Sequence, residues 1–387
     1  MICNRNAMLL RRIAGAVLIL VCVVCVAGEP PSREDSAKYE ELAQSGYSAI
    51  PELIRAMATA ETNVAISSLG DALAATGPEF LKQPEYAAAL AEFRKTAEAG
   101  NVIAQRNLGL AYCMGAGVPQ DDAEAAQWFR KAAEQGDAQG QYHLGVMYDN
   151  GEGVPQDHVE AAKWYRLAAD QGFAWAQNNL GAAYEHGEGV ERDLEKAVKY
   201  YRLAAEQGDS LAQCNLGLAY ENGEGVEQDF AEAAKWYRLA AEQGDAQGQY
   251  FLGVMYDNGR GVPQDFAEAV RYYRLAAEQG FADAQYNLAV SYDMGEGVDE
   301  NDVEAVKYYR LAAEQEHSSA QYNLGVMYEN GEGVKRDVAE AAKWYRLAAE
   351  QGNESAQEAL TNLELQSSPD DFWGSMVLLG LRLLLML

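Results

Sequence analysis

Cysteine is scarce in this sequence of 387 residues, which contains five in all. Three of them lie within the first 28 residues, and the other two are Cys113 and Cys214. These two lie three repeat units apart in the array described below, which is too far for the Cα separation that a disulfide needs. Packing of side chains, rather than a disulfide framework, must therefore hold the fold together.

Positive charge is also scarce. The chain has 30 Lys and Arg residues against 59 Asp and Glu residues, which gives a net charge of -29 and a pI near 4.4. Such a surface repels the phosphates of nucleic acids and of anionic lipids, so the sequence predicts neither as a partner. A basic protein or peptide is a more compatible partner.

The motifs of catalysis and of cofactor binding are missing. The four histidines (His143, His158, His186 and His317) occupy different places in the repeats, and no Ser/His/Asp order is legible. The loop GEGVPQD at 151–157 has no preceding strand and no third glycine, so it does not match a dinucleotide-binding loop. It also lacks the acid ladder of an EF-hand. We therefore predict no enzyme activity, no cofactor and no metal.

The N-terminal segment has the layout of a secretory signal peptide. Arg11 and Arg12 precede an apolar run at 13–26, and the small residues Ala27 and Gly28 follow. The run is shorter than a membrane-spanning helix requires, which favours cleavage after residue 28. The sequence thus predicts an exported protein, in a periplasm, outside the cell or in an ER lumen.

A period of 36 residues organises the rest of the chain. Segments such as QRNLGLAY and QYHLGVMY begin at Gln105 and recur seven times, and a truncated eighth copy begins at Gln357. Self-similarity of this kind is the signature of a solenoid. We predict a repeat array at 101–365, preceded at 29–100 by a linker and a degenerate capping repeat.

Each unit reads as two helices joined by a turn. Ala176, Leu180 and Tyr184 share one face of a first helix, and no alternating strand pattern occurs. Asp157 and Glu160 fit a capping box at the start of a second helix, as do three later Asp/Glu pairs. Gly172 and its equivalents fall where a left-handed residue ends the second helix, whereas Glu316 replaces glycine and predicts a weaker turn.

The pattern A-x-x-x-L-G-x-x-Y-x-x-G-x-G-V-x-x-D-x-x-x-A-x-x-W-Y-x-x-A-A-x-x-G resembles the Sel1-like repeat of the tetratricopeptide-related superfamily. It is seen at 176–208, where Tyr200 stands in place of the tryptophan. The resemblance implies an all-α, right-handed α-solenoid of helix-turn-helix repeats and a role as an adaptor that binds proteins or peptides. A cysteine-rich branch of that family is linked to β-lactam binding, so a hydrolase or small-molecule binder is the alternative. That branch pairs its cysteines, which this chain does not.

Two variable positions on the first helix predict a binding groove. They would form a stripe of tyrosines beside a stripe of carboxylates, and Trp175 would add a local anchor. The candidate partner-binding residues are Tyr142, Asp149, Trp175, Glu185, Glu221, Tyr250, Asp257, Tyr286, Asp293, Tyr322 and Glu329. The same pattern also suits tyrosines that fill space between helices and acids that only face solvent.

The C-terminal residues 366–387 read as a linker followed by an apolar tail. The segment FWGSMVLLGLRLLLML at 372–387 carries one charge, Arg382, and is short for a membrane span. Two roles remain open: contact with a membrane, or a cap over the last repeat, which lacks its second helix.

Overall fold

The computed structural model describes residues 84–115 and 118–367. These residues form sixteen α-helices and no strand, which confirms the all-α prediction. None of the described helices is both long enough and apolar enough to cross a membrane. The predicted signal peptide at 1–28, most of the predicted capping region and the apolar tail at 372–387 lie outside the described residues.

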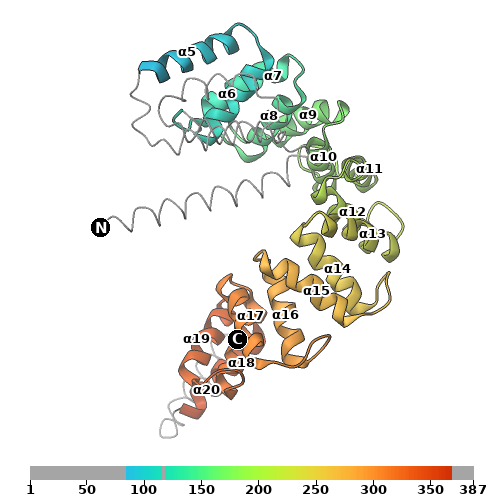
Figure 1. Ribbon diagram of the computed structural model, residues 1–387, viewed down its shortest axis with the longest axis vertical. Helices are drawn as coiled ribbons and strands as arrows, with labels where there is room; N and C mark the ends of the chain where they lie inside the picture. Colours follow the sequence, from blue (N-terminus) through green and yellow to red (C-terminus); the bar gives the residue numbers. More distant parts are fainter. Residues whose placement is uncertain (1–83, 116–117, 368–387) are drawn as a thin grey trace, which may run out of the picture. The chain divides into compact units, whose positions relative to one another are not determined.

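The helices follow one another as first and second helices of successive repeats (Figure 1), in two units that divide after Gln228. The first unit contains α5 (Pro84–Glu98), α6 (Val102–Met114), α7 (Asp122–Glu134), α8 (Ala138–Asn150), α9 (His158–Asp170), α10 (Ala174–His186), α11 (Leu194–Ala205) and α12 (Ser210–Asn222). The second unit contains α13 (Phe230–Glu242), α14 (Ala246–Asn258), α15 (Phe266–Glu278), α16 (Ala282–Met294), α17 (Asp302–Glu314), α18 (Ser318–Asn330), α19 (Val338–Glu350) and α20 (Glu354–Ser367).

A glycine brings the two helices of a repeat close together. A Cβ on Gly145 of α8 would lie 2.7 Å from the ring of Tyr165 on α9, so the ring lies against the α8 backbone. Tyr165 is buried, and this contact fills the space between the helices. The same contact is made by the pairs Gly109/Phe129, Gly181/Tyr201, Gly253/Tyr273 and Gly325/Tyr345.

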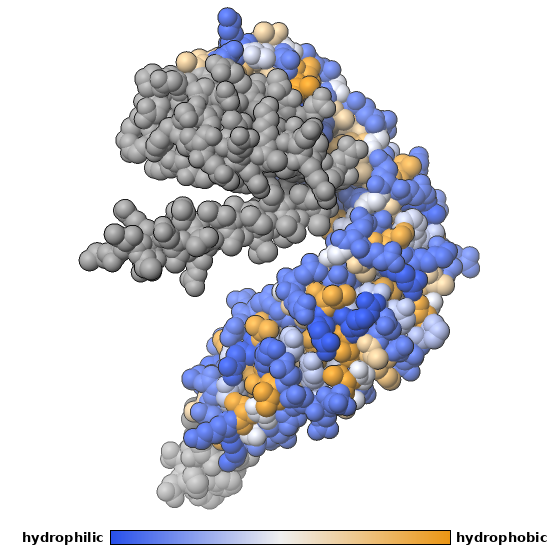
Figure 2. Space-filling model, in the orientation of Figure 1, coloured by the Kyte–Doolittle hydropathy of each residue, from blue (hydrophilic) through white to orange (hydrophobic). Residues whose placement is uncertain are grey.

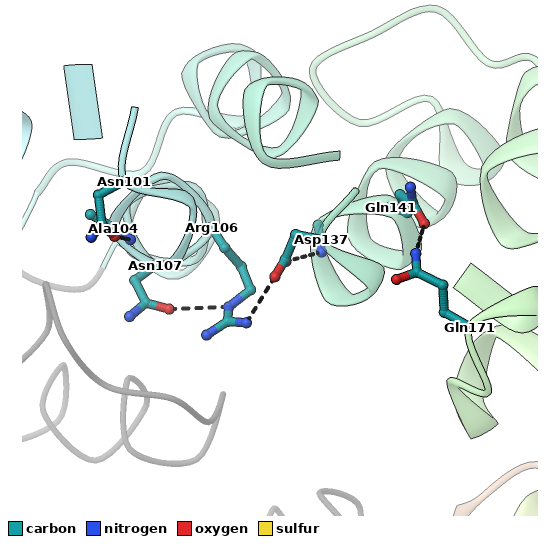
Figure 3. A network of polar contacts seen from close by, with 8 residues as sticks. Asn101, Ala104, Arg106, Asn107, Asp137, Gln141 and Gln171 are labelled. Atoms are coloured by element: carbon teal, nitrogen blue, oxygen red, sulfur yellow. Dashed lines mark hydrogen bonds and ion pairs between the residues drawn. The ribbon is translucent and has the colours of Figure 1, made fainter. Parts of the chain in front are cut away.

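A buried glutamine joins neighbouring repeats. Gln141 Nε2 donates to the carbonyl of Ala133 at the end of α7 (3.2 Å), and Gln141 Oε1 accepts from Gln171 at the end of α9 (2.7 Å; Figure 3). One amide thus links three helices and adds a second donor to the Ala133 carbonyl, which also accepts from the Gly136 N–H (3.0 Å). Both bonds recur at Gln105, Gln177, Gln249, Gln285 and Gln321.

The predicted capping box forms only in half. Asp157 Oδ1 accepts from the backbone N–H of Glu160 (3.0 Å), as expected for an N-cap. The return bond of a capping box is replaced, because the Asp157 N–H donates to the carbonyl of Tyr148 (2.8 Å). The Glu160 side chain pairs with Lys163 at 2.5 Å, on the helix surface. The Asp157 N–H therefore already has an acceptor in the Tyr148 carbonyl and does not need the Glu160 side chain.

The repeated Gly-x-Gly turn is a packing device. Its second glycine, Gly189, has φ of 68°, and a Cβ there would lie 1.9 Å from the carbonyl oxygen of His158 at the start of α9. The turn after each first helix thus rests on the backbone of the preceding repeat. The equivalent close approaches are Gly153 to Asp122, Gly225 to Leu194, Gly261 to Phe230, Gly297 to Phe266 and Gly333 to Asp302.

Substitutions of Gly172 and Gly189, which both have positive φ, distinguish the cost of backbone strain from the cost of a steric clash. Gly172→Ala should cost about 1 kcal/mol, because φ is 87° but no atom lies within 4 Å of the new Cβ. Gly189→Ala should cost about 2 kcal/mol more, because the same strain is joined by a clash with backbone. Urea unfolding followed by circular dichroism measures both. Equal midpoints for the two variants would contradict the packing role of the turn.

Glu316 gives the opposite test. It is the one non-glycine residue with positive φ (65°) among the described residues, and it stands where the other repeats have glycine. Glu316→Gly should raise the free energy of unfolding by up to about 1 kcal/mol, because a left-handed conformation costs an L side chain about that much. A urea midpoint at or below that of the parent would contradict this reading.

Candidate functional site

The predicted binding residues all lie on first helices and all are half-buried. Tyr142 and Asp149 belong to α8, Trp175 and Glu185 to α10, and Glu221 to α12 in the first unit. In the second unit the tyrosine and acid positions fall on α14, α16 and α18. The residues there are Tyr250, Asp257, Tyr286, Asp293, Tyr322 and Glu329.

The carboxylates hold the hydroxyls of the buried tyrosines. Tyr165 donates to Asp149 Oδ2 at 3.1 Å, so the acid fixes the ring that lies against Gly145. Burial, followed by the charge of Asp149, raises the pKa of Tyr165, which keeps the hydroxyl protonated and able to donate. The same bond joins Tyr201 to Glu185, Tyr273 to Asp257, Tyr309 to Asp293 and Tyr345 to Glu329. These five predicted acids thus also have a packing role.

The tyrosines lie at the junction between repeats. The Tyr142 ring centroid is 5.2 Å from that of Phe173, which is the N-cap residue of α10. The Phe173 side chain makes no capping hydrogen bond, so at this N-cap position an aromatic contact takes the place of the hydrogen bond. Tyr250 packs on Phe281 in the same way (5.2 Å), and Tyr286 stacks on His317 (4.6 Å).

An ion pair occupies the same junction one repeat earlier. Arg106 stands at the tyrosine position of α6, and its Nη1 lies 3.3 Å from Oδ1 of Asp137, the N-cap residue of α8 (Figure 3). Its Nε also donates to Asn107 (3.3 Å). One backbone junction therefore accepts either aromatic or charged pairs.

Trp175 belongs to an aromatic cluster in the first unit. Its ring centroid lies 5.7 Å from Tyr142 and 5.5 Å from Phe173. All three side chains are half-buried, so the cluster both covers the junction and presents ring surface to solvent.

A pocket of about 420 Å³ in the second unit brings two predicted residues together. Tyr322 and Glu329 line it on α18, together with Tyr345 on α19. The far wall is formed by Ala359 and Asn362 of α20, which the sequence reasoning missed. The other lining residues are Val326 and Asn330. The truncated eighth repeat in the sequence could have predicted this wall, because its first helix, α20, packs on the seventh repeat as the first helix of each repeat packs on the one before.

Comparison with known proteins identifies the repeats. The model of the Sel1 repeat matches seven consecutive segments, at 102–137, 138–173, 176–209, 210–245, 246–281, 282–317 and 318–353. The chain belongs to the Sel1 repeat family. A comparison with curated protein sequences gives no match.

Two solved structures of Sel1 repeat proteins are similar to this chain. A protective antigen present in uropathogenic Escherichia coli strains, with an SLR fold, is 41% identical over 71% of this chain, with a TM-score of 0.65. The match covers 59% of the Escherichia coli chain, so the present chain spans only part of that relative's length. A Sel1 repeat protein from Oxalobacter formigenes is 34% identical, covers 84% of this chain and 89% of its own, and has a TM-score of 0.60.

Two titratable groups on α8 have strongly shifted pKa values. Burial raises the pKa of Tyr142 to about 12, and the charge of Asp209 acts in the same direction. His143 stacks on Phe129 at 5.0 Å. Burial, followed by the positive charge of Arg106, lowers the pKa of His143 to about 3. This Sel1 repeat therefore holds a neutral histidine beside Tyr142.

His143 should make the stability of the protein fall in acid. Its ordinary pKa is 6.5, so between pH 6.5 and about 3 the unfolded chain binds a proton that the native chain does not. Lowering the pH through this window favours unfolding. His143→Asn, which copies Asn107 and Asn179 of the neighbouring repeats, should flatten the dependence of Tm on pH below 6.5. An unchanged slope would show that His143 protonates without cost.

Proposed function

We propose that this Sel1 repeat protein is a non-enzymatic, exported scaffold that binds basic segments of proteins or peptides on its first-helix faces. The observation that carries the proposal is the pocket in the second unit, where Tyr322, Glu329 and Tyr345 lie together. A ring face and a carboxylate in one pocket suit the apolar stem and the positive head of Lys or Arg.

Charge supports a basic partner. Asp and Glu outnumber Lys and Arg by 59 to 30, so the whole surface attracts cations, and the pocket would select among them. The visible face of the second unit carries separate hydrophobic areas among hydrophilic ones (Figure 2), which suits contact with an extended segment at several points. The aromatic cluster of Tyr142, Phe173 and Trp175 offers a second contact in the first unit.

Export and the role of the tail belong to the same proposal. The signal-like layout of residues 1–28 supports export, and the apolar segment at 372–387 would bring the scaffold to a membrane or cover its last repeat.

A charge-removing variant tests the pocket. Glu329→Gln keeps an acceptor for the Tyr345 hydroxyl, which now lies 2.7 Å from Glu329 Oε2, but removes the negative charge. We expect it to weaken binding of a fluorescent decapeptide with central Lys and Arg residues by about tenfold, equivalent to about 1.4 kcal/mol. Fluorescence anisotropy at physiological salt measures the affinity.

Glu350→Gln is the matched control, because Glu350 is an exposed acid on α19 outside the pocket and the variant has the same net charge. Its affinity should equal that of the parent, and a decapeptide with Glu in place of Lys and Arg should not bind. If Glu329→Gln and Glu350→Gln lost the same amount of affinity, the peptide would be attracted by the overall negative charge and not bound by the pocket.

A further inference from the structure

Three positions recur together at each contact between a repeat and the next. The first is the acid near the end of the first helix, the second is the opening residue of the second helix, and the third is the residue between the two glycines of the next turn. In the repeat of α8 and α9 these are Asp149, His158 and Glu188. The close approach of Gly189 to the His158 carbonyl holds the third position beside the second.

The side chains at these positions differ between repeats. The next repeat has Glu185, Leu194 and Glu224, and a later one has Asp257, Phe266 and Glu296. The second position is thus apolar in those repeats, and His158 replaces a packing residue with a nitrogen ligand.

The geometry of Asp149, His158 and Glu188 suits a metal ion. Each offers one ligand atom, and these three atoms lie within 4.8 Å of one another, the one such group in the described part of the chain. His158 Nδ1 lies 2.8 Å from Asp149 Oδ1, and Asp149 Oδ2 is already oriented by the Tyr165 hydroxyl. Tetrahedral zinc bonds of about 2.0 to 2.2 Å place ligand atoms about 3.3 to 3.6 Å apart. Glu188 is exposed, so its side chain can rotate to close the remaining distance.

Access and charge also suit a cation. The side chains of Asp149 and His158 are 32% and 40% exposed, so an ion can reach them from solvent. The hydrogen bond that His158 donates to Asp149, together with the charges of Asp149, Glu188 and Asp157, raises the pKa of His158. The N-terminus of α9 opposes a cation, but its partial charge of about +0.5 is small beside three carboxylates.

We infer that Asp149, His158 and Glu188 form a binding site for a divalent transition metal such as Zn²⁺, which links the α8–α9 repeat to the turn that follows α10. The metal replaces the proton shared by His158 Nδ1 and Asp149 Oδ1. An imidazole with two carboxylates favours Zn²⁺ over Mg²⁺ or Ca²⁺, which prefer oxygen ligands alone. Three protein ligands leave a fourth position for water.

Calorimetric titration of the full chain with ZnCl₂, after removal of metal with EDTA and in excess MgCl₂, tests the site. We expect one Zn²⁺ per chain, with an affinity that falls as the pH is lowered, because protons compete with the metal for its ligands. His158→Leu, which copies Leu194 of the next repeat, should lower the affinity by about tenfold or more.

Glu188→Gln separates a metal site from a simple ion pair, since it leaves the Asp149–His158 contact in place. It should also lower the Zn²⁺ affinity by about tenfold. The control is Glu152→Gln, which removes the same charge at the equivalent position one repeat earlier and should leave the Zn²⁺ affinity unchanged. Binding of Zn²⁺ by His158→Leu or Glu188→Gln with the parent's affinity would overturn the inference. So would equal losses in Glu152→Gln and Glu188→Gln.

Discussion

The close approach of two helices at a glycine is the constraint on which the rest of the structure depends. At Gly145 the absence of a side chain lets the Tyr165 ring lie against the backbone of α8. The ring then points its hydroxyl at the end of the first helix, and Asp149 is the group that accepts from it. Most of the acid stripe is therefore a consequence of packing, because at Asp149, Glu185, Asp257, Asp293 and Glu329 the carboxylate accepts from a buried hydroxyl that needs a partner. A ligand that binds these acids uses side chains that the fold has already oriented, so little ordering cost remains.

The contacts between repeats divide into constant and variable ones. Gln141 and its equivalents carry the same two hydrogen bonds in repeat after repeat, and the second glycine of each turn meets the same backbone carbonyl. The tyrosine position, in contrast, holds an ion pair at Arg106 and an aromatic pair at Tyr142. Because the constant contacts set the register, the variable ones can change without loss of the fold. Binding chemistry is expected at the variable positions for this reason.

The sequence predicts most of the fold, because its determinants are local. Helix faces, N-caps such as Asp157 and the left-handed Gly172 follow from spacing within one repeat. The residue spacing in the sequence does not predict two features, the incomplete capping box and the wall of the pocket, because both depend on contacts with residues outside the motif. The capping box is incomplete because the loop carbonyl of Tyr148 takes the cap N–H. The pocket at Tyr322 has a wall on α20, whose residues belong to a repeat that lacks its second helix in the sequence.

The histidine site shows the same limit for function. His158 is separated from Asp149 by nine positions, and from Glu188 by the rest of α9 and the whole of α10, a spacing that matches no metal motif. The contact of Gly189 with the His158 backbone places Glu188 beside His158, and the bond from the Asp157 N–H to the Tyr148 carbonyl holds His158 near Asp149. In a repeat array that contact recurs at a fixed register, so one substitution at the opening residue of a second helix is enough to complete a set of ligands. The repeats with Leu194 and Phe266 have the same backbone contact and lack the nitrogen, which is why the chemistry of a junction depends on a single residue while its geometry does not.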